Sequence, residues 1–158
     1  MTYTFLEGIT RADVAFEAQG KTQEELIEQA GLALQSVQVE LGTVKSVIKR
    51  KINITAPTID NLLYKFLEEL VFLKDTEQLV FCDIKANIRT DQKKEGTKKR
   101  EELYLNCELS GEIINPDTQQ LGTDIKAVTL HKYKVEKIEE KTSAGTNMNW
   151  KATVVLDI

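Results

Sequence analysis

Two aspartates near opposite ends of the sequence have the chemistry of a cation site. Asp13 opens an alternating segment near the start, and Asp157 is the penultimate residue, followed by Ile158 with its α-carboxylate. If the segments that carry them are neighbouring strands, three carboxylates converge, and charges of one sign repel unless a cation lies among them. Oxygen ligands without cysteine or histidine suit Ca²⁺ or Mg²⁺. The alternative is that Asp13 only begins a strand and Asp157 is a solvated chain end.

Other site chemistries find little support in the sequence. It has no Walker loop, no dinucleotide-binding glycine motif and no zinc spacing. The single histidine, His131, lies in an alternating segment, so a histidine-based triad is not indicated. Cys82 and Cys107 fall on the apolar phase of alternating segments, which favours two buried free thiols. A cross-strand pair of these cysteines is the alternative.

The composition predicts one soluble domain over residues 1–158. The chain has 158 residues, of which 41% are hydrophobic and 29% are charged, with a net charge of -4. An acidic chain is not expected to hold nucleic acid by bulk electrostatics. The start of the chain lacks the basic and apolar regions of a signal peptide, and charges interrupt the most apolar segment, 62–73. We therefore expect a cytoplasmic protein without a membrane span.

The first half of the chain predicts strands that alternate with helices. Residues 13–18 alternate as a strand does, and Thr22 with Glu25 forms a capping box for a helix that ends before Gly42. A strand over 44–55 stops at Pro57. The second helix begins near Thr58 or Asp60 and carries a broad apolar face between Leu62 and Leu73.

The second half predicts strands only. Residues 80–88 and 103–109 alternate and form a long hairpin, with a polar, solvated tip over 91–99. Basic residues at this tip can contact RNA, but acidic neighbours favour a mobile charged turn; they are Lys93, Lys94, Lys98, Lys99 and Arg100. Strands over 124–137 and 150–158 follow. The order β-α-β-α-β-β-β-β indicates an α+β domain with two helices packed on a largely antiparallel sheet.

Three separated blocks of the sequence resemble the archease family, in the family's order. The first runs over residues 10–26 and contains an Ala-Asp pair, a short strand and Gly-Lys-Thr. The second combines Gly111-Glu112 with residues 122–131, which contain Lys-Ala-Val-Thr, and the third is the ending 150–158, which stops at Asp-Ile. The resemblance implies a two-helix α+β fold whose six-stranded antiparallel sheet curls toward a barrel.

The resemblance also implies a function and a site. Archeases are protein cofactors, not enzymes, that activate the GTP-dependent RtcB-type RNA ligase of tRNA splicing and RNA repair. They promote guanylylation of the ligase and its multiple turnover, and RNA is handled by the ligase. The family binds a divalent cation, seen as calcium, through residues that correspond here to Asp13, Asp157 and Ile158. Lys126 of the second block corresponds to a residue that functions in ligase activation.

The chain departs from the family at two histidine positions. Many relatives have a histidine before the opening block, where this chain has Gly8 or Thr10, and another in the loop after Gly-Glu, where Gln119 or its neighbour stands. A chaperone-like modulator of a tRNA-modifying enzyme, such as a tRNA methyltransferase, is the alternative function. An independent metal-dependent hydrolase is disfavoured, because no candidate base or nucleophile accompanies the carboxylates.

Overall fold

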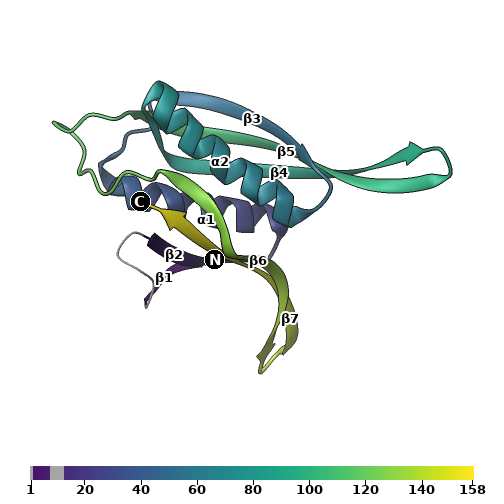
Figure 1. Cartoon of the computed structure of the whole chain (residues 1–158). Helices are drawn as coiled ribbons and strands as arrows, with labels where there is room; N and C mark the ends of the chain where they lie inside the picture. The colour runs from purple at the N-terminus through teal and green to yellow at the C-terminus, as the bar shows by residue number, and fades with distance from the viewer. Residues whose placement is uncertain (1, 8–12) are drawn as a thin grey trace.

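The computed structural model describes residues 2–7 and 13–158. It is an α+β fold with two α-helices, as predicted, and seven strands (Figure 1). In chain order the elements are β1 (Thr2–Leu6), β2 (Asp13–Gly20), α1 (Gln23–Gln38), the short 3₁₀ helix η1 (Leu41–Thr43), β3 (Ile48–Ala56), α2 (Ile59–Glu77), β4 (Leu79–Glu95), β5 (Lys98–Ile113), β6 (Ala127–Thr142) and β7 (Gly145–Asp157). Within the described residues no helix is long and apolar enough to cross a membrane.

The first helix begins where the sequence provides its cap. The hydroxyl oxygen of Thr22 accepts a hydrogen bond from the backbone N–H of Glu25 at 3.1 Å. The carboxylate of Glu25 accepts in return from the N–H of Lys21 at 3.2 Å, one residue before the cap. These two bonds satisfy N–H groups that have no partner inside the helix. The predicted capping box is confirmed, and α1 ends before Gly42 as expected.

The strands form two antiparallel sheets, and the prediction of one six-stranded sheet that curls toward a barrel is wrong. The order of the larger sheet is β1-β2-β7-β6, and that of the smaller is β3-β5-β4. No closed barrel forms in the described part of the chain. Strand β1 was not predicted, because its five residues alternate only weakly. Both helices lie between the two sheets (Figure 1).

Side chains of α1 hydrogen-bond to one edge of the three-stranded sheet. Gln35 accepts from the N–H of Phe81 at 3.2 Å, and Glu28 accepts from the N–H of Ala86 at 2.9 Å. Both N–H groups belong to the edge strand β4. A strand joins a sheet through unpaired N–H and C=O groups at its edge. The contacts of α1 therefore oppose continuation of the sheet past β4.

Side chains of α2 also hydrogen-bond to edge strands, here at the facing edges of both sheets. The ammonium of Lys65 donates to the carbonyl oxygen of Thr55 in β3 at 3.1 Å. The hydroxyl of Tyr64 donates to the carbonyl oxygen of Val128 in β6 at 3.0 Å. Helix α2 thus occupies the position where β3 and β6 would otherwise pair, which is the physical reason for two sheets.

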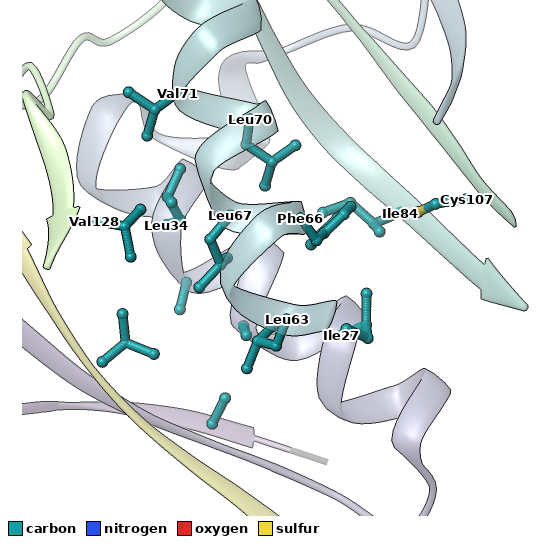
Figure 2. Packing of buried hydrophobic residues seen from close by; sticks show 14 of the residues in the cluster. Ile27, Leu34, Leu63, Phe66, Leu67, Leu70, Val71, Ile84, Cys107 and Val128 are labelled. Carbon is teal, nitrogen blue, oxygen red and sulfur yellow. The ribbon is translucent and has the colours of Figure 1, made fainter. Parts of the chain in front are cut away.

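One continuous core fills the space between the sheets and the helices. The helices contribute Ile27, Leu34, Leu63, Phe66 and Leu67, all fully buried, and Figure 2 shows them packed together. Each such side chain stabilises the fold by roughly 1.5–3 kcal/mol through removal of its apolar surface from water. The core therefore fixes the helices against the inner faces of both sheets.

The hairpin of β4 and β5 is longer than predicted. From Asp83 outward its strands pair without interruption as far as Glu95 and Lys98, so most of residues 91–99 are strand, and most of those described are exposed to solvent, as predicted. The hairpin extends well beyond the body of the protein (Figure 1). Both cysteines of the hairpin are free, Cys107 buried and Cys82 half-buried, which confirms free thiols and excludes the cross-strand pair.

Candidate functional site

The structure places Asp13 and Asp157 side by side. Asp13 is the first residue of β2 and Asp157 the last of β7, and the two lie directly opposite each other in the antiparallel ladder. Directly opposed residues project from the same face, with Cβ atoms about 4.5–5.5 Å apart. Both aspartates are half-buried. Two carboxylates from opposite ends of the sequence therefore share one small region of the sheet.

The start of β6 and the last residue, Ile158, complete this region. The backbone N–H of Lys126 donates to the carbonyl oxygen of Asp157 at 2.8 Å. Ala127 then opens β6 directly opposite Asp157, on the side away from Asp13. The half-buried side chain of Ile158 packs against the main core, which holds the end of the sequence in place. We call Asp13, Asp157 and Ile158 together the carboxylate corner.

The two aspartates of the carboxylate corner lie on the face of the sheet turned away from the helices. Leu156 is buried in the core against them, and successive side chains of a strand point to opposite faces. Asp157 and its partner Asp13 therefore point outward. The next residues on their face, Ala15 and Val155, are each only 1% exposed. A carboxylate beside buried apolar groups attracts a cation more strongly than one surrounded by water.

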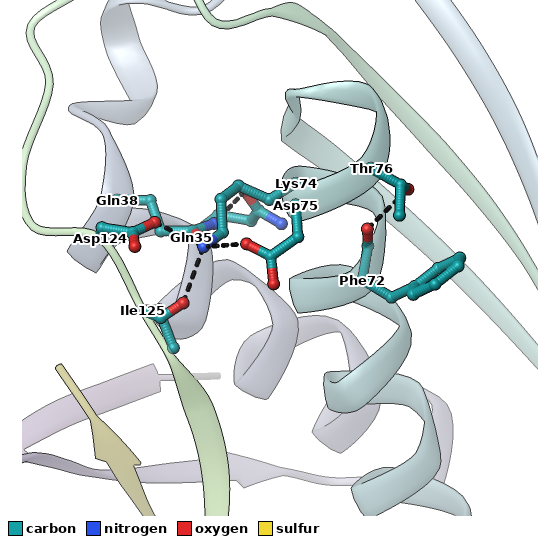
Figure 3. A network of polar contacts seen from close by, with 8 residues as sticks. All are labelled: Gln35, Gln38, Phe72, Lys74, Asp75, Thr76, Asp124 and Ile125. Atoms are coloured by element: carbon teal, nitrogen blue, oxygen red, sulfur yellow. Dashed lines mark hydrogen bonds and ion pairs between the residues drawn. The ribbon is translucent and has the colours of Figure 1, made fainter.

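Lys74, buried near the end of α2, holds the segment that leads into the corner. Its ammonium donates to the carboxylate of Asp124 and, at 2.7 Å, to the carbonyl oxygen of Ile125 (Figure 3). It also forms an ion pair with Asp75 at 2.7 Å. Burial lowers the pKa of Lys74, but hydrogen bonds to Asp124 and Asp75 together raise it more, so its pKa lies above the ordinary value. Lys74 is therefore protonated and fixes the backbone next to Lys126.

Lys126 lines a groove of about 540 Å³. The groove lies along α2 and β6, and neither Asp13 nor Asp157 lines it. Its charged lining residues are Lys65, Glu68, Glu69, Asp75 and Lys126, and its apolar lining includes the exposed ring of Phe72. The backbone of Lys126 thus belongs to the corner, whereas its exposed side chain is available to a partner.

The residues of the corner fit part of a cation site. Ca²⁺ takes six to eight oxygen ligands, and Asp13 and Asp157 offer carboxylate oxygens from adjacent strands. Across the described ranges, no group of three or more His, Cys, Asp and Glu side chains is close enough to hold a metal. The side chains alone therefore make an incomplete site, which the α-carboxylate, water or a partner would have to complete.

Among the positions that differ from the family pattern, Gln119 lies in the part of the chain that the structure describes. Gly8 and Thr10 lie outside the described residues. Gln119 is buried, and its amide donates to the carbonyl oxygen of Ile113 at 3.0 Å and accepts from the N–H of Asn115 at 3.1 Å. Gln119 therefore braces the loop after β5. His131 is exposed, beside the irregular part of β6.

Sequence reasoning did not single out Lys74. A signal was present, because Lys74 follows Leu70 and Val71 by four and three residues and so lies on the apolar face of α2. Lysine is almost never fully buried without a charged or polar partner. The partner, Asp124, could not be chosen in advance among the 25 acidic residues.

Sequence comparison finds relatives over nearly the whole chain. The model of the archease protein family matches residues 3–158. "Protein archease" of Methanosarcina acetivorans is 34% identical over 156 residues, which cover 99% of this chain and 95% of that protein. "Protein archease" of Pyrococcus furiosus is 32% identical over 147 residues, 93% of each chain.

The fold of a solved structure agrees with these sequence matches. The solution structure of Methanobacterium thermoautotrophicum protein 1598 superposes with a TM-score of 0.69 and 27% identity, covering 99% of this chain and 98% of that chain. The family match extends over the carboxylate corner and the core. The chain belongs to the archease family.

Proposed function

We propose that this protein is a metal-binding activator of a GTP-dependent RNA ligase of the RtcB type. In tRNA splicing and RNA repair it promotes guanylylation of the ligase and its multiple turnover, and it is a protein cofactor rather than a ligase. The observation that supports this best is the in-register pairing of Asp13 with Asp157 beside Ile158, in a chain of the archease family.

The carboxylate corner is the proposed binding site for a divalent cation, for which we propose calcium. When bound, the cation supplies positive charge and open coordination positions for oxygen ligands of a partner. Asp13 and Asp157 hold it from adjacent strands, and the apolar neighbours of the pair restrict water. The described side chains provide too few ligands for the cation. We propose that the partner provides the remaining oxygen ligands.

Lys126 is proposed to contact the ligase or its bound nucleotide. Its backbone is tied to Asp157, so its position is coupled to that of the corner. Its exposed ammonium can donate charge-assisted hydrogen bonds to a phosphate or carboxylate. In this arrangement the outward-facing carboxylates and Lys126 act together at one end of the four-stranded sheet.

The decisive experiment measures guanylylation of an RtcB-type ligase from labelled GTP. We expect Asp157→Asn to reduce the stimulation of the ligase at least tenfold, because a cation ligand is lost while size and strand pairing are kept. Asp117→Asn, an exposed loop aspartate, is the matched control and should stimulate fully. Unimpaired stimulation by Asp157→Asn would refute the role of the corner.

A second experiment concerns the partner. Affinity purification of the tagged full chain from its source cell should recover an RtcB-type ligase. Recovery of a tRNA methyltransferase without a ligase would contradict the proposal and support the chaperone-like alternative.

A third experiment addresses the α-carboxylate. Addition of Gly-Ser after Ile158 should weaken calcium binding, as measured by titration calorimetry, because the carboxylate is moved away from Asp13 and Asp157. An unchanged affinity would remove Ile158 from the ligand set while leaving the two aspartates in it.

A further inference from the structure

The outer face of the three-stranded sheet carries polar side chains in cross-strand rows. Alternate residues of its strands, such as Ile52, Cys107 and Ile84, point into the core, so their neighbours point to solvent. The outward rows, written in the order β3, β5, β4, are Lys49–Ser110–Asp83, Lys51–Glu108–Lys85, Asn53–Asn106–Asn87 and Thr55–Tyr104–Arg89. Except for Ser110 and Tyr104, which are half-buried, these residues are exposed.

The row of three asparagines has no explanation in the fold. Asparagine is depleted in strands, where threonine and valine fit better. The side chains of Asn53, Asn106 and Asn87 make no hydrogen bond to any described residue, and all three are exposed. Each amide offers donors and acceptors together. The row therefore presents unused hydrogen-bonding groups on a rigid sheet.

The rows on either side of the asparagines add charge and an aromatic ring. Lys51 and Lys85 flank Glu108 in one row. In the other, the guanidinium carbon of Arg89 lies 5.0 Å from the centre of the Tyr104 ring. Shallow hollows of about 370, 280 and 430 Å³ follow one another along this face. The hollows form a continuous trough in which basic residues outnumber acidic ones.

We propose that this trough binds single-stranded RNA directly. Lysines and arginine neutralise phosphates, a ring and a guanidinium stack on unpaired bases, and amides bond to base edges and to 2′-hydroxyl groups. The excess of basic over acidic residues in the trough contrasts with the net charge of -4 of the whole chain. This charge complementarity favours RNA over a basic protein segment. The inference goes beyond the proposed function, because it needs neither ligase nor cation.

The test is fluorescence anisotropy of a labelled 12-nucleotide single-stranded RNA with the full chain, without ligase or divalent cations. At 50 mM KCl we expect a dissociation constant on the order of 10⁻⁵ M. If the trough makes three or four phosphate contacts, a plot of the logarithm of the association constant against the logarithm of the salt concentration should have a slope of about -2 to -3. Binding that is undetectable at 50 mM KCl overturns the proposal.

Matched variants locate the binding. Lys51→Ala/Lys85→Ala should weaken binding about tenfold and reduce the magnitude of the slope by about 1.4, the value for two phosphate contacts. Lys21→Ala/Lys141→Ala removes the same charge from exposed positions outside the trough and should change binding less than twofold. If both double variants lose RNA affinity equally, the binding is due to bulk electrostatics and not to the trough, and the proposal is overturned. Glu108→Gln should tighten binding two- to threefold, which no misfolded variant would do.

The asparagine row separates binding from folding. Replacement of all three residues by threonine should raise the melting temperature, because threonine fits a strand better, while it weakens RNA binding at least fivefold. Unchanged RNA affinity in this stable variant would contradict the role of the row. The same variant should still stimulate guanylylation of the ligase to the wild-type extent. This inference and the proposed function can therefore fail independently.

Discussion

In the three-stranded sheet, Lys51, Glu108 and Lys85 lie side by side across the strands, and their charges alternate in sign. In the four-stranded sheet, Asp13 lies opposite Asp157, so two carboxylates are neighbours. Like charges directly opposite each other destabilise a sheet, by roughly 0.2–1 kcal/mol on the scale of cross-strand pairs. An alternating row needs no ligand to be stable, whereas the carboxylate pair gains stability from a cation. The same antiparallel geometry therefore places opposite charges beside one another in one sheet and like charges beside one another in the other.

The two regions also differ in how the chain reaches them. Strands β4 and β5 are joined by a tight turn and pair from that turn back to Leu79 and Ile113, with one bulge near Cys82, which makes this hairpin the most local pairing of the smaller sheet. The carboxylate corner joins β2, near the start, to β7, at the end. Such a contact forms only after a long loop has closed. We therefore expect changes in the smaller sheet to act mainly on stability and changes in the corner to act mainly on the response to a cation, and four experiments examine this difference.

The largest expected effect is on Gly111 of β5. A Cβ there would overlap the carbonyl oxygen of Val80 and lie 2.7 Å from the Cα of Phe81, both backbone atoms of β4. Gly111→Ala should lower the free energy of unfolding by about 3 kcal/mol or more, and the melting temperature by roughly 6–12 °C. Circular dichroism during heating measures this, with Gly42→Ala as control, because nothing lies within 4 Å of a Cβ at Gly42. A normal melting temperature for Gly111→Ala would show that the ladder can yield at this point.

The second effect is the response to calcium. At a calcium concentration of 100 times Kd, wild type should gain about 2.7 kcal/mol of stability. Asp157→Asn should lose this gain because a ligand is missing, yet equal or slightly exceed wild type without cations because the repulsion across the strands is relieved. Thermal unfolding with calcium and with a chelator measures both, and Glu108→Gln is the control carboxylate in the other sheet. An undiminished calcium response in Asp157→Asn would mean that the pair is not the binding site.

The third effect concerns Lys74, which connects the core to the corner. Lys74→Met keeps the apolar stem but leaves the carbonyl oxygen of Ile125 and the carboxylate of Asp124 without their donor. We expect a loss of about 2 kcal/mol in urea unfolding and faster hydrogen exchange at the N–H of Lys126. Lys65→Met, on the exposed side of the same helix, should cost about 0.5 kcal/mol or less. Exchange at Lys126 that stays slow in Lys74→Met would show that the corner is held without this lysine.

The smallest expected effect is a loss of folding stability at alkaline pH, which comes from Cys107 in the smaller sheet. Burial raises the pKa of the Cys107 thiol from 9.0 to about 12. The folded thiol therefore stays neutral while the unfolded one ionises, so its stabilising contribution is complete below pH 9 and is lost between pH 9 and about 12. At pH 10 this loss is about 1.4 kcal/mol. Urea unfolding at pH 8, 9 and 10 should show a shallower decline in Cys107→Val, and an identical decline would contradict the assignment.

Much of the local structure could be predicted because its causes are local. Thr22 and Glu25 mark the start of α1 by two hydrogen bonds within five residues, and Leu62 to Leu73 marks α2 by helical spacing. The hairpin tip was predicted as exposed to solvent, but the extent of its strands was underestimated, because the cross-strand pairing that extends β4 to Glu95 is not visible in a polar segment. Strand β1 was missed for the same reason, since it is defined by its pairing with β2 and only weakly by its own pattern.

The candidate site was predictable only in part. The sequence identified Asp13, Asp157 and Ile158 first by chemistry and then by resemblance, and Lys126 by resemblance alone. It did not reveal that Lys126 lines a groove that neither Asp13 nor Asp157 lines, or that Lys74 fixes the backbone beside Lys126. Those relations depend on which surfaces α2 contacts.

By itself, the sequence determined the two helices, the alternating strands, the free thiols and the residue types that can bind a cation. These follow from periodicity, capping and side-chain chemistry, which act over a few residues. Only the tertiary structure decided that the strands form two sheets, because side chains of α1 and α2 occupy the edge hydrogen-bonding groups. It also decided which charges are neighbours, since cross-strand register joins residues as distant as Asp13 and Asp157. Register is a property of paired strands, and a single strand does not contain it.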